Sequence, residues 1–206
     1  MPERRFVPKF RPHAPRLIFL SHVDYVHRKM RWTVKDDLLS GVLDDMLPSA
    51  ILVSLLGKLR GQAIFTTDEE SGMRHAQRIG RRIFRDYPAP RGLHRYMGDR
   101  SWLPVVCVLE VTAQYPSADV TFENCVMFDA GRIRKAMSHS SVRDVAYAIN
   151  GAGSWDETWR MAEAKLPAFS VCVPTDGDYH TYGATARLAQ IDKYRRTLVA
   201  IDRALA

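Results

Sequence analysis

The chain has 206 residues, of which 46% are hydrophobic and 26% charged, and its formal net charge is +7 at pH 7. This composition supports a packed core and argues against intrinsic disorder, and no apolar run is long enough for a membrane span. The three cysteines are widely spaced without a C-x-x-C pair, which argues against a zinc ribbon and favours reduced thiols in a cytoplasmic protein.

The amino-terminal half begins with a basic, proline-rich segment that predicts an extended arm over residues 1–16, followed by a single domain over 17–206. A strand is predicted over 16–28, where apolar residues do not alternate cleanly. Three helices are predicted next, over 33–47, 48–61 and 66–87. Thr33 is the expected cap of the first, with Asp36 and Asp37 in its first turn.

The carboxyl-terminal half predicts two strands over 103–113 and 118–130, joined as a hairpin by the short connection between them. The remaining predicted elements are helices over 132–149 and 155–166, a strand over 167–175, a loop over 176–185 and a helix over 186–205. Helices covering a small, mostly antiparallel sheet are the architecture that this order favours, so the predicted class is α+β.

The strand over 118–130 carries Glu123 and Cys125 on one face, because strand residues alternate between faces. If the hairpin register places Glu110 opposite Thr121, Glu110 and Glu123 become diagonal neighbours. Two carboxylates in that position are candidate ligands for Mg²⁺ or Mn²⁺. A slip of one residue separates them, and an ordinary polar sheet face is the alternative.

Positive charge is concentrated in residues 1–32 and 71–100, each with eight Lys/Arg and two acidic residues. Arginine suits phosphate because its planar guanidinium presents a fork of donors. We therefore expect nucleic-acid binding, with a solvated basic surface as the alternative. The candidate binding residues are Arg74, Arg78, Arg81, Arg82, Arg85, Arg91, Arg95, Arg132, Arg134 and Lys135. The last three follow Gly131 at a predicted helix start, where backbone N–H groups favour an anion.

Four segments, "LIFLSHVDY", "VCVLEV", "VTFENCVMFDAGRIRK" and "YHTYGATARLAQIDKYRRTLVAIDRAL", resemble the filamentous-phage (inovirus-type) replication-initiation proteins and their prophage relatives. The resemblance implies a mobile-element protein that binds DNA and nicks it with a tyrosine and a metal. It implies Tyr182 and Glu123 as catalytic residues, with Tyr179 and Tyr194 as other candidate nucleophiles.

The segment "VTFENCVMFDAGRIRK" departs from the family pattern at the metal-binding site. Those initiators carry a His-hydrophobe-His pair, whereas this chain has Phe122-Glu123-Asn124-Cys125. The sequence therefore leaves open whether catalysis remains. The alternative function is a non-catalytic regulatory or assembly protein that binds an acidic protein partner.

Overall fold

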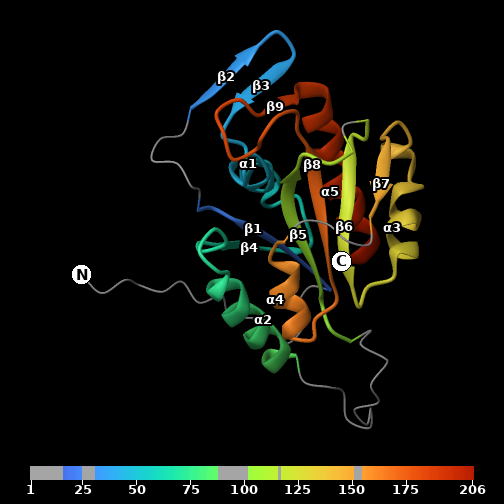
Figure 1. Ribbon diagram of the computed structural model, residues 1–206. Helices are drawn as coiled ribbons and strands as arrows, with labels where there is room; N and C mark the ends of the chain where they lie inside the picture. Colours follow the sequence, from blue (N-terminus) through green and yellow to red (C-terminus); the bar gives the residue numbers. More distant parts are fainter. Residues whose placement is uncertain (1–15, 25–30, 88–101, 116, 151–154) are drawn as a thin grey trace.

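A six-stranded sheet with helices on both faces forms the centre of the protein in a computed structural model, which describes residues 16–24, 31–87, 102–115, 117–150 and 155–206 (Figure 1). The predicted arm over 1–16 lies almost wholly outside the described residues. The strand order is β4-β1-β5-β8-β6-β7. Their bounds are β1 (Leu17–His22), β4 (Gln62–Thr66), β5 (Val105–Thr112), β6 (Val120–Val126), β7 (Tyr147–Ile149) and β8 (Ala168–Pro174).

Most neighbouring strands in this sheet are parallel, and only β6 and β8 pair antiparallel. The predicted small, mostly antiparallel sheet is therefore wrong, although the mixture of helices and strands is confirmed. The predicted hairpin between β5 and β6 is also wrong, because both strands pair with β8, which lies between them. The apolar run of β5 is buried along its whole length, as is typical of parallel strands covered on both faces.

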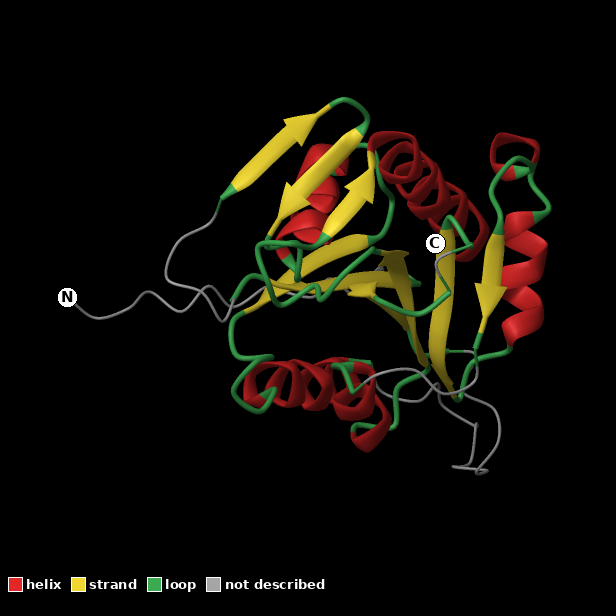
Figure 2. Ribbon diagram, turned by 45° about the horizontal axis from the view of Figure 1, so that its top comes forward, coloured by secondary structure: helices red, strands yellow, loops and turns green. Residues whose placement is uncertain are grey.

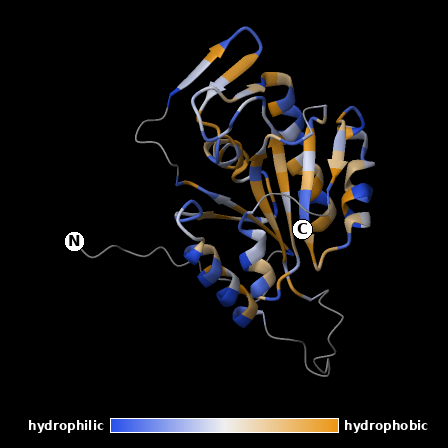
Figure 3. Cartoon of the chain, viewed as in Figure 1, coloured by the Kyte–Doolittle hydropathy of each residue, from blue (hydrophilic) through white to orange (hydrophobic). Residues whose placement is uncertain are grey.

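Two apolar cores lie on opposite faces of the sheet (Figure 2). The helices on one face are α1 (Met46–Leu55), α3 (Ala130–Met137) and α5 (Leu188–Leu205), and those on the other are α2 (Arg74–Asp86) and α4 (Thr158–Glu163). Figure 3 shows hydrophobic strands at the centre and a hydrophilic outer side of α2. The protein is therefore a three-layer α/β structure, with the sheet as the middle layer.

A second, antiparallel sheet contains β2 (Trp32–Lys35), β3 (Leu38–Gly41) and β9 (Thr185–Arg187). Part of the helix predicted over 33–47 is thus a β-hairpin. Its two-residue turn is Asp36-Asp37, and Asp36 adopts a φ of 55°, a conformation that Asp tolerates and tight hairpin turns require. The helix predicted over 132–149 is also shorter: α3 ends at Met137, before the 3-10 turn η1 (Ser140–Val142) and β7.

No described helix combines the length and the apolar character that crossing a membrane would require.

Candidate metal centre

The candidate centre lies at the carboxyl ends of the neighbouring parallel strands β1 and β5. From β1 the chain passes to β4 on one side and then crosses to β5 on the other, so the strand order reverses here. Such a reversal leaves a crevice outside the carboxyl ends, where open α/β sheets bind ligands. His22 is the last residue of β1, and Glu110 lies near the end of β5, so the fold delivers both to this crevice.

Asp44, in the segment between β3 and α1, stands between two histidines. Its Oδ1 lies 3.3 Å from Nε2 of His22, and its Oδ2 lies 3.0 Å from Nε2 of His180. The same Nε2 of His22 lies 3.9 Å from Oε2 of Glu110. The two oxygens of the buried Asp44 carboxylate therefore face two different imidazole rings.

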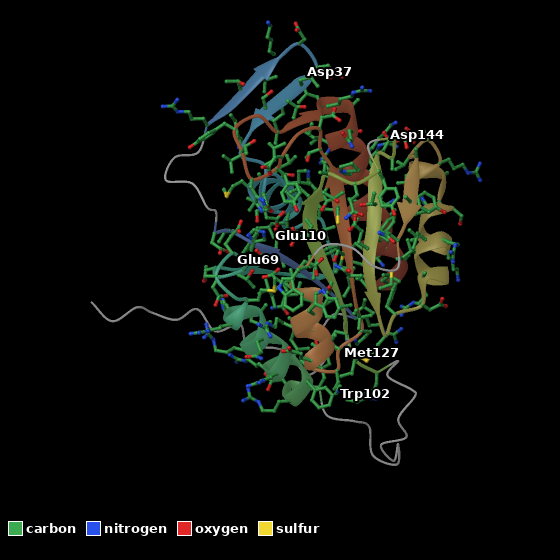
Figure 4. The ribbon with its side chains drawn as sticks, in the orientation of Figure 1. Asp37, Glu69, Trp102, Glu110, Met127 and Asp144 are labelled. Atoms are coloured by element: carbon green, nitrogen blue, oxygen red, sulfur yellow. The ribbon has the colours of Figure 1, made fainter. Side chains whose placement is uncertain are left out.

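Two groups of side chains with metal-ligating atoms share Asp44. Within each group the ligand atoms lie within 4.8 Å of one another; the groups are His22, Asp44, Asp45 and Glu110, and Asp44, Glu70 and His180. Glu70 comes from the loop after β4, and His180 comes from the loop between β8 and β9. Five separate segments of the chain thus converge on one place, and Figure 4 labels Glu69 and Glu110 in this region.

His22 is oriented through its second ring nitrogen. Nδ1 lies 3.2 Å from the main-chain oxygen of Asp24 and 3.5 Å from its carboxylate. The Asp24 carboxylate also accepts a hydrogen bond from the backbone N–H of Glu70, at 3.2 Å. An oxygen acceptor behind the ring is the usual partner of a metal-ligating histidine, because it fixes the tautomer and the ring plane.

Asp45 is fully buried and anchors the segment that carries Asp44. It accepts a hydrogen bond of 2.5 Å from the hydroxyl of Ser21, which lies 2.8 Å from the hydroxyl of Ser49. Ser49 in turn donates to the main-chain oxygen of His22 at 2.8 Å. The peptide bond between Asp44 and Asp45 is cis. This network holds the end of β1 and the start of α1 together.

Burial and mutual repulsion perturb the titration of this group. Burial, reinforced by neighbouring carboxylates, raises the pKa of Glu110 well above its ordinary value. Burial also raises the pKa of Glu69 to about 8 and raises that of Glu70. For His22, burial acts to lower the pKa, but a hydrogen bond to Asp24 and the surrounding acidic groups outweigh it and raise the pKa. The site thus favours positive charge.

The donor set fits divalent metal ions. Buried carboxylate oxygens of Asp45, Glu70 and Glu110 have no hydrogen-bond partner among the described residues, and Oδ1 of Asp24 and of Asp44 each face only a ring nitrogen of His22, at 3.5 and 3.3 Å. Unpartnered buried oxygens are costly, and cations would compensate them. Imidazole nitrogens together with carboxylate oxygens suit Zn²⁺, Mn²⁺ and related ions.

A cavity of about 330 Å³ opens beside these ligands. Its lining residues are Asp44, Glu69, Glu70, Gly72, Met73, Glu110, Val111, Trp155, Tyr179 and His180. The acidic residues and His180 form its polar part, and the rest of the lining is uncharged. A small ligand can therefore reach the metal-ligating atoms.

The two carboxylates singled out in the sequence lie in different surroundings. Glu110 is in the first ligand group, whereas Glu123 is in neither group. Glu110 is opposite Cys172 on β8 and Glu123 is opposite Ser170, so the whole of β8 separates the two carboxylates. Glu123 is fully buried and accepts a hydrogen bond of 2.8 Å from the Thr121 hydroxyl.

The three candidate tyrosines also differ in position. Tyr179 lines the cavity, and its ring centroid lies 4.5 Å from that of His180. Tyr182, in the same loop, is 45% exposed and is not among the lining residues. Tyr194 is fully buried on α5, where its hydroxyl donates to the main-chain oxygen of Val171 at 2.9 Å.

The candidate nucleic-acid-binding residues do not gather on one face. Arg74, Arg78, Arg81, Arg82 and Arg85 lie on α2, whereas Arg132, Arg134 and Lys135 lie on α3; Arg91 and Arg95 fall outside the described residues. These two helices pack on opposite faces of the sheet. The described residues of this set therefore form two separate groups, one on each side of the sheet.

At Gly131, where an anion site is predicted, the backbone N–H binds a side chain of the protein instead. The side chain of Asp129 caps α3 and accepts a hydrogen bond of 2.8 Å from the backbone N–H of Gly131. The guanidinium of Arg132 lies 5.3 Å from the ring centroid of Phe128. The carboxylate that caps α3 would repel an anion, so this turn serves as a helix cap and not as a phosphate site.

Sequence reasoning missed Asp44, Glu69, Glu70, His22 and His180. Asp44 lies within the helix predicted over 33–47, and Glu69 and Glu70 lie in the first turn of the helix predicted over 66–87. Glu69 and Glu70 in fact follow β4 and precede α2, which begins at Arg74. The available signal was the placement of polar residues directly after apolar runs, as in "LIFLSHVD" and "AIFTTDEE".

Comparison with known proteins gives matches in structure only. No protein-family model matches the sequence, and no curated protein matches it. Similar solved structures include a TET aminopeptidase from a marine-sediment thaumarchaeon, with a TM-score of 0.59 and 14% identity over 84% of this chain and 52% of that one. The TET1 peptidase of Pyrococcus horikoshii has a TM-score of 0.58 and 15% identity over 84% and 53% of the two chains.

An M18-family aminopeptidase from Thermotoga maritima is also similar, with a TM-score of 0.56 and 15% identity over 84% of this chain and 48% of that one. The chain therefore spans about half the length of these neighbours. At such low identity the likeness establishes a shared fold. That fold overturns the resemblance to phage replication initiators, and with it the predictions of DNA binding, replication and mobile-element function.

Proposed function

We propose that this chain is a metal-dependent peptidase that removes the amino-terminal residue of peptides. The observation that carries the proposal is the position of Asp44 between His22 and His180, with one oxygen toward each ring. Glu69 lies beside this arrangement and lines the same cavity. Such a carboxylate between two nitrogen donors is suited to hold a pair of divalent ions.

The residues divide into ligands and a proton acceptor. Asp44 would be the shared ligand, His22 and Glu110 would complete one position, and Glu70 and His180 would complete the other. A pair of bound divalent ions supplies an activated water and polarises a carbonyl oxygen.

Glu69 is the candidate general base. Burial raises the pKa of its side chain to about 8, so its carboxylate is more basic than that of an exposed glutamate. Glu69 is then suited to take a proton from the attacking water and to deliver it to the leaving amine.

The charge of the cavity favours action at the amino end of a peptide. No lysine or arginine is among the described residues that line it, so a terminal carboxylate would meet no fixed positive side chain. An amino terminus would instead meet acidic side chains. The structural neighbours whose names describe aminopeptidases support the same choice, although only the fold is shared.

The test uses the full chain, freed of metal by chelation and then supplied with Zn²⁺, Mn²⁺ or Co²⁺. We expect metal-dependent hydrolysis of L-alanyl and L-leucyl 4-nitroanilides and none of their N-acetyl derivatives. Glu69→Gln should lower kcat by about 10²- to 10⁴-fold, the typical contribution of a general base, with metal content unchanged. Asp44→Asn should reduce metal content itself, measured by elemental analysis.

The matched control is Asp37→Asn, because Asp37 is an exposed residue at the tip of the β2–β3 hairpin, away from the centre in Figure 4. It should retain both metal content and activity. Equal hydrolysis with and without chelator, or full activity of Glu69→Gln, would contradict the proposed function.

A further inference from the structure

The uncharged part of the cavity lining remains available to a substrate side chain once the metal ligands and Glu69 have been assigned. Its members are Gly72, Met73, Val111, Trp155 and Tyr179. The hydroxyl of Tyr179, like that of an ordinary tyrosine, is neutral at physiological pH. This part of the lining therefore carries no charge.

Trp155 stands out within this set because it is 62% exposed although it is a large apolar side chain. Its ring stacks on that of Trp159, with centroids 5.2 Å apart and an interplanar angle of 17°. The stacking fixes the indole in one orientation beside the cavity. An ordered aromatic surface that the fold leaves uncovered is suited to contact a ligand.

The backbone beside Trp155 is held firmly to the sheet. Asp156 is buried and accepts hydrogen bonds from the backbone N–H of Thr158 at 2.8 Å and from the side-chain amide of Asn124 at 2.9 Å. The hydroxyl of Ser170 on β8 also donates to Asp156. These bonds anchor the segment before α4, so the position of Trp155 is preformed.

Another part of the lining is tied to the same helix. The guanidinium of Arg160, on α4, donates a hydrogen bond of 3.0 Å to the main-chain oxygen of Gly72. The following residue, Met73, is 2% exposed, and its N–H donates to the main-chain oxygen of Asp68 at 2.7 Å. Trp155 and Met73 are thus both held by α4 or by its immediate contacts.

We propose that Trp155, with Met73 and Val111, forms a subsite that selects peptides whose first side chain is large and apolar, such as leucine, methionine or phenylalanine. This inference rests on the proposed peptidase function for its place in the reaction. An apolar side chain gains by leaving water for these surfaces. An acidic side chain meets no lysine or arginine among the described lining residues and meets the carboxylates of Glu69 and Glu70 instead.

The test compares 4-nitroanilides of L-alanine, L-leucine, L-phenylalanine and L-glutamate with the Zn²⁺-loaded full chain. We expect kcat/KM for leucine and phenylalanine to exceed that for alanine by about tenfold or more, the usual effect of filling an apolar pocket. Trp155→Ala should lower kcat/KM for the leucine and phenylalanine substrates by about tenfold and change kcat/KM for the alanine substrate by less than about twofold. Trp155→Phe should restore most of it, because an aromatic surface remains.

The matched control is Tyr147→Ala, since Tyr147 is a partly exposed aromatic residue on β7, at the far edge of the sheet from the centre. Its substrate preference should equal that of the wild-type chain. Thermal melts of each variant establish that it is folded.

A second readout does not depend on hydrolysis. Titration calorimetry with L-phenylalaninol, L-leucinol and L-alaninol should show tighter binding of the two larger amino alcohols, and Trp155→Ala should weaken only these. Absence of any hydrolysis together with this binding preference would overturn the peptidase function and support the subsite. Hydrolysis without apolar preference, preference for glutamate, or an unchanged profile in Trp155→Ala would overturn the subsite alone.

Discussion

Removal of divalent metal should lower the melting temperature of this protein by roughly 8–16 °C relative to the metal-saturated form. Two carboxylates 4.8 Å apart, the separation limit within each ligand group, repel each other by about 3.5 kcal/mol at an effective dielectric constant of 20. Bound cations replace this repulsion with attraction. Metal at about 1,000 times its Kd stabilises the folded state by about 4 kcal/mol, and each kcal/mol raises Tm by about 2–4 °C in a chain of this length.

The assay is a calorimetric melt of the chelated protein across a Zn²⁺ or Mn²⁺ titration. Asp44→Asn should lose most of the shift, because an amide NH2 group replaces one of the two carboxylate oxygens that would bind cations. Asp37→Asn on the hairpin turn should keep it. An equal shift in Asp44→Asn and the wild-type chain would refute the assignment of Asp44 as the shared ligand.

The same titration has a defined pH dependence. Burial raises the pKa of two proposed ligands, Glu110 and Glu70, above their ordinary values, so protons compete with metal at both groups. The Tm shift should therefore shrink as pH falls from 8 toward 6. A larger shift at pH 6 would contradict ligation by these buried carboxylates.

Three further predictions concern residues outside the ligand set. Burial raises the pKa of Glu157 from 4.5 to about 7. The stabilisation that this residue contributes is therefore full below pH 4.5, and it is lost as pH rises through 7. Glu157→Gln should remove up to roughly 3 kcal/mol of this pH-dependent decline in the free energy of unfolding, measured in urea melts. Asp202→Ala should cost about 3 kcal/mol in the same melts, because this buried carboxylate accepts hydrogen bonds from backbone N–H groups just before β4. Cys107 and Cys172 are buried and Cys125 is partly exposed, so a thiol reagent should modify one cysteine in the native protein and three after denaturation.

Each of these measurements has its own control. Asp192→Ala, an exposed position on the same helix as Asp202, should cost less than about 1 kcal/mol. A parallel pH dependence in Glu157→Gln and the wild-type chain would contradict the buried-acid assignment. Rapid native labelling of three thiols would contradict the burial of Cys107 and Cys172.

The local pattern of the sequence determined several elements correctly. The predicted strands over 103–113, 118–130 and 167–175 correspond to β5, β6 and β8, and the predicted helix over 186–205 corresponds to α5. Apolar runs bounded by turn residues and helical periodicity carry this information, because both depend on residues close in the chain. The pattern over 33–47 was misread as a helix because Asp36 and Asp37 suit a hairpin turn as well as a helix start.

The tertiary structure alone decided how the strands are ordered and which polar residues meet. Periodicity states that β5 and β6 are strands, but it does not state that β8 inserts between them and separates Glu110 from Glu123. His22 and His180 are far apart in the sequence, and only parallel pairing and the loop after β8 place both beside Asp44. Side chains at the ends of parallel strands converge because the strands share a direction, which is a property of the assembled sheet and not of any one segment.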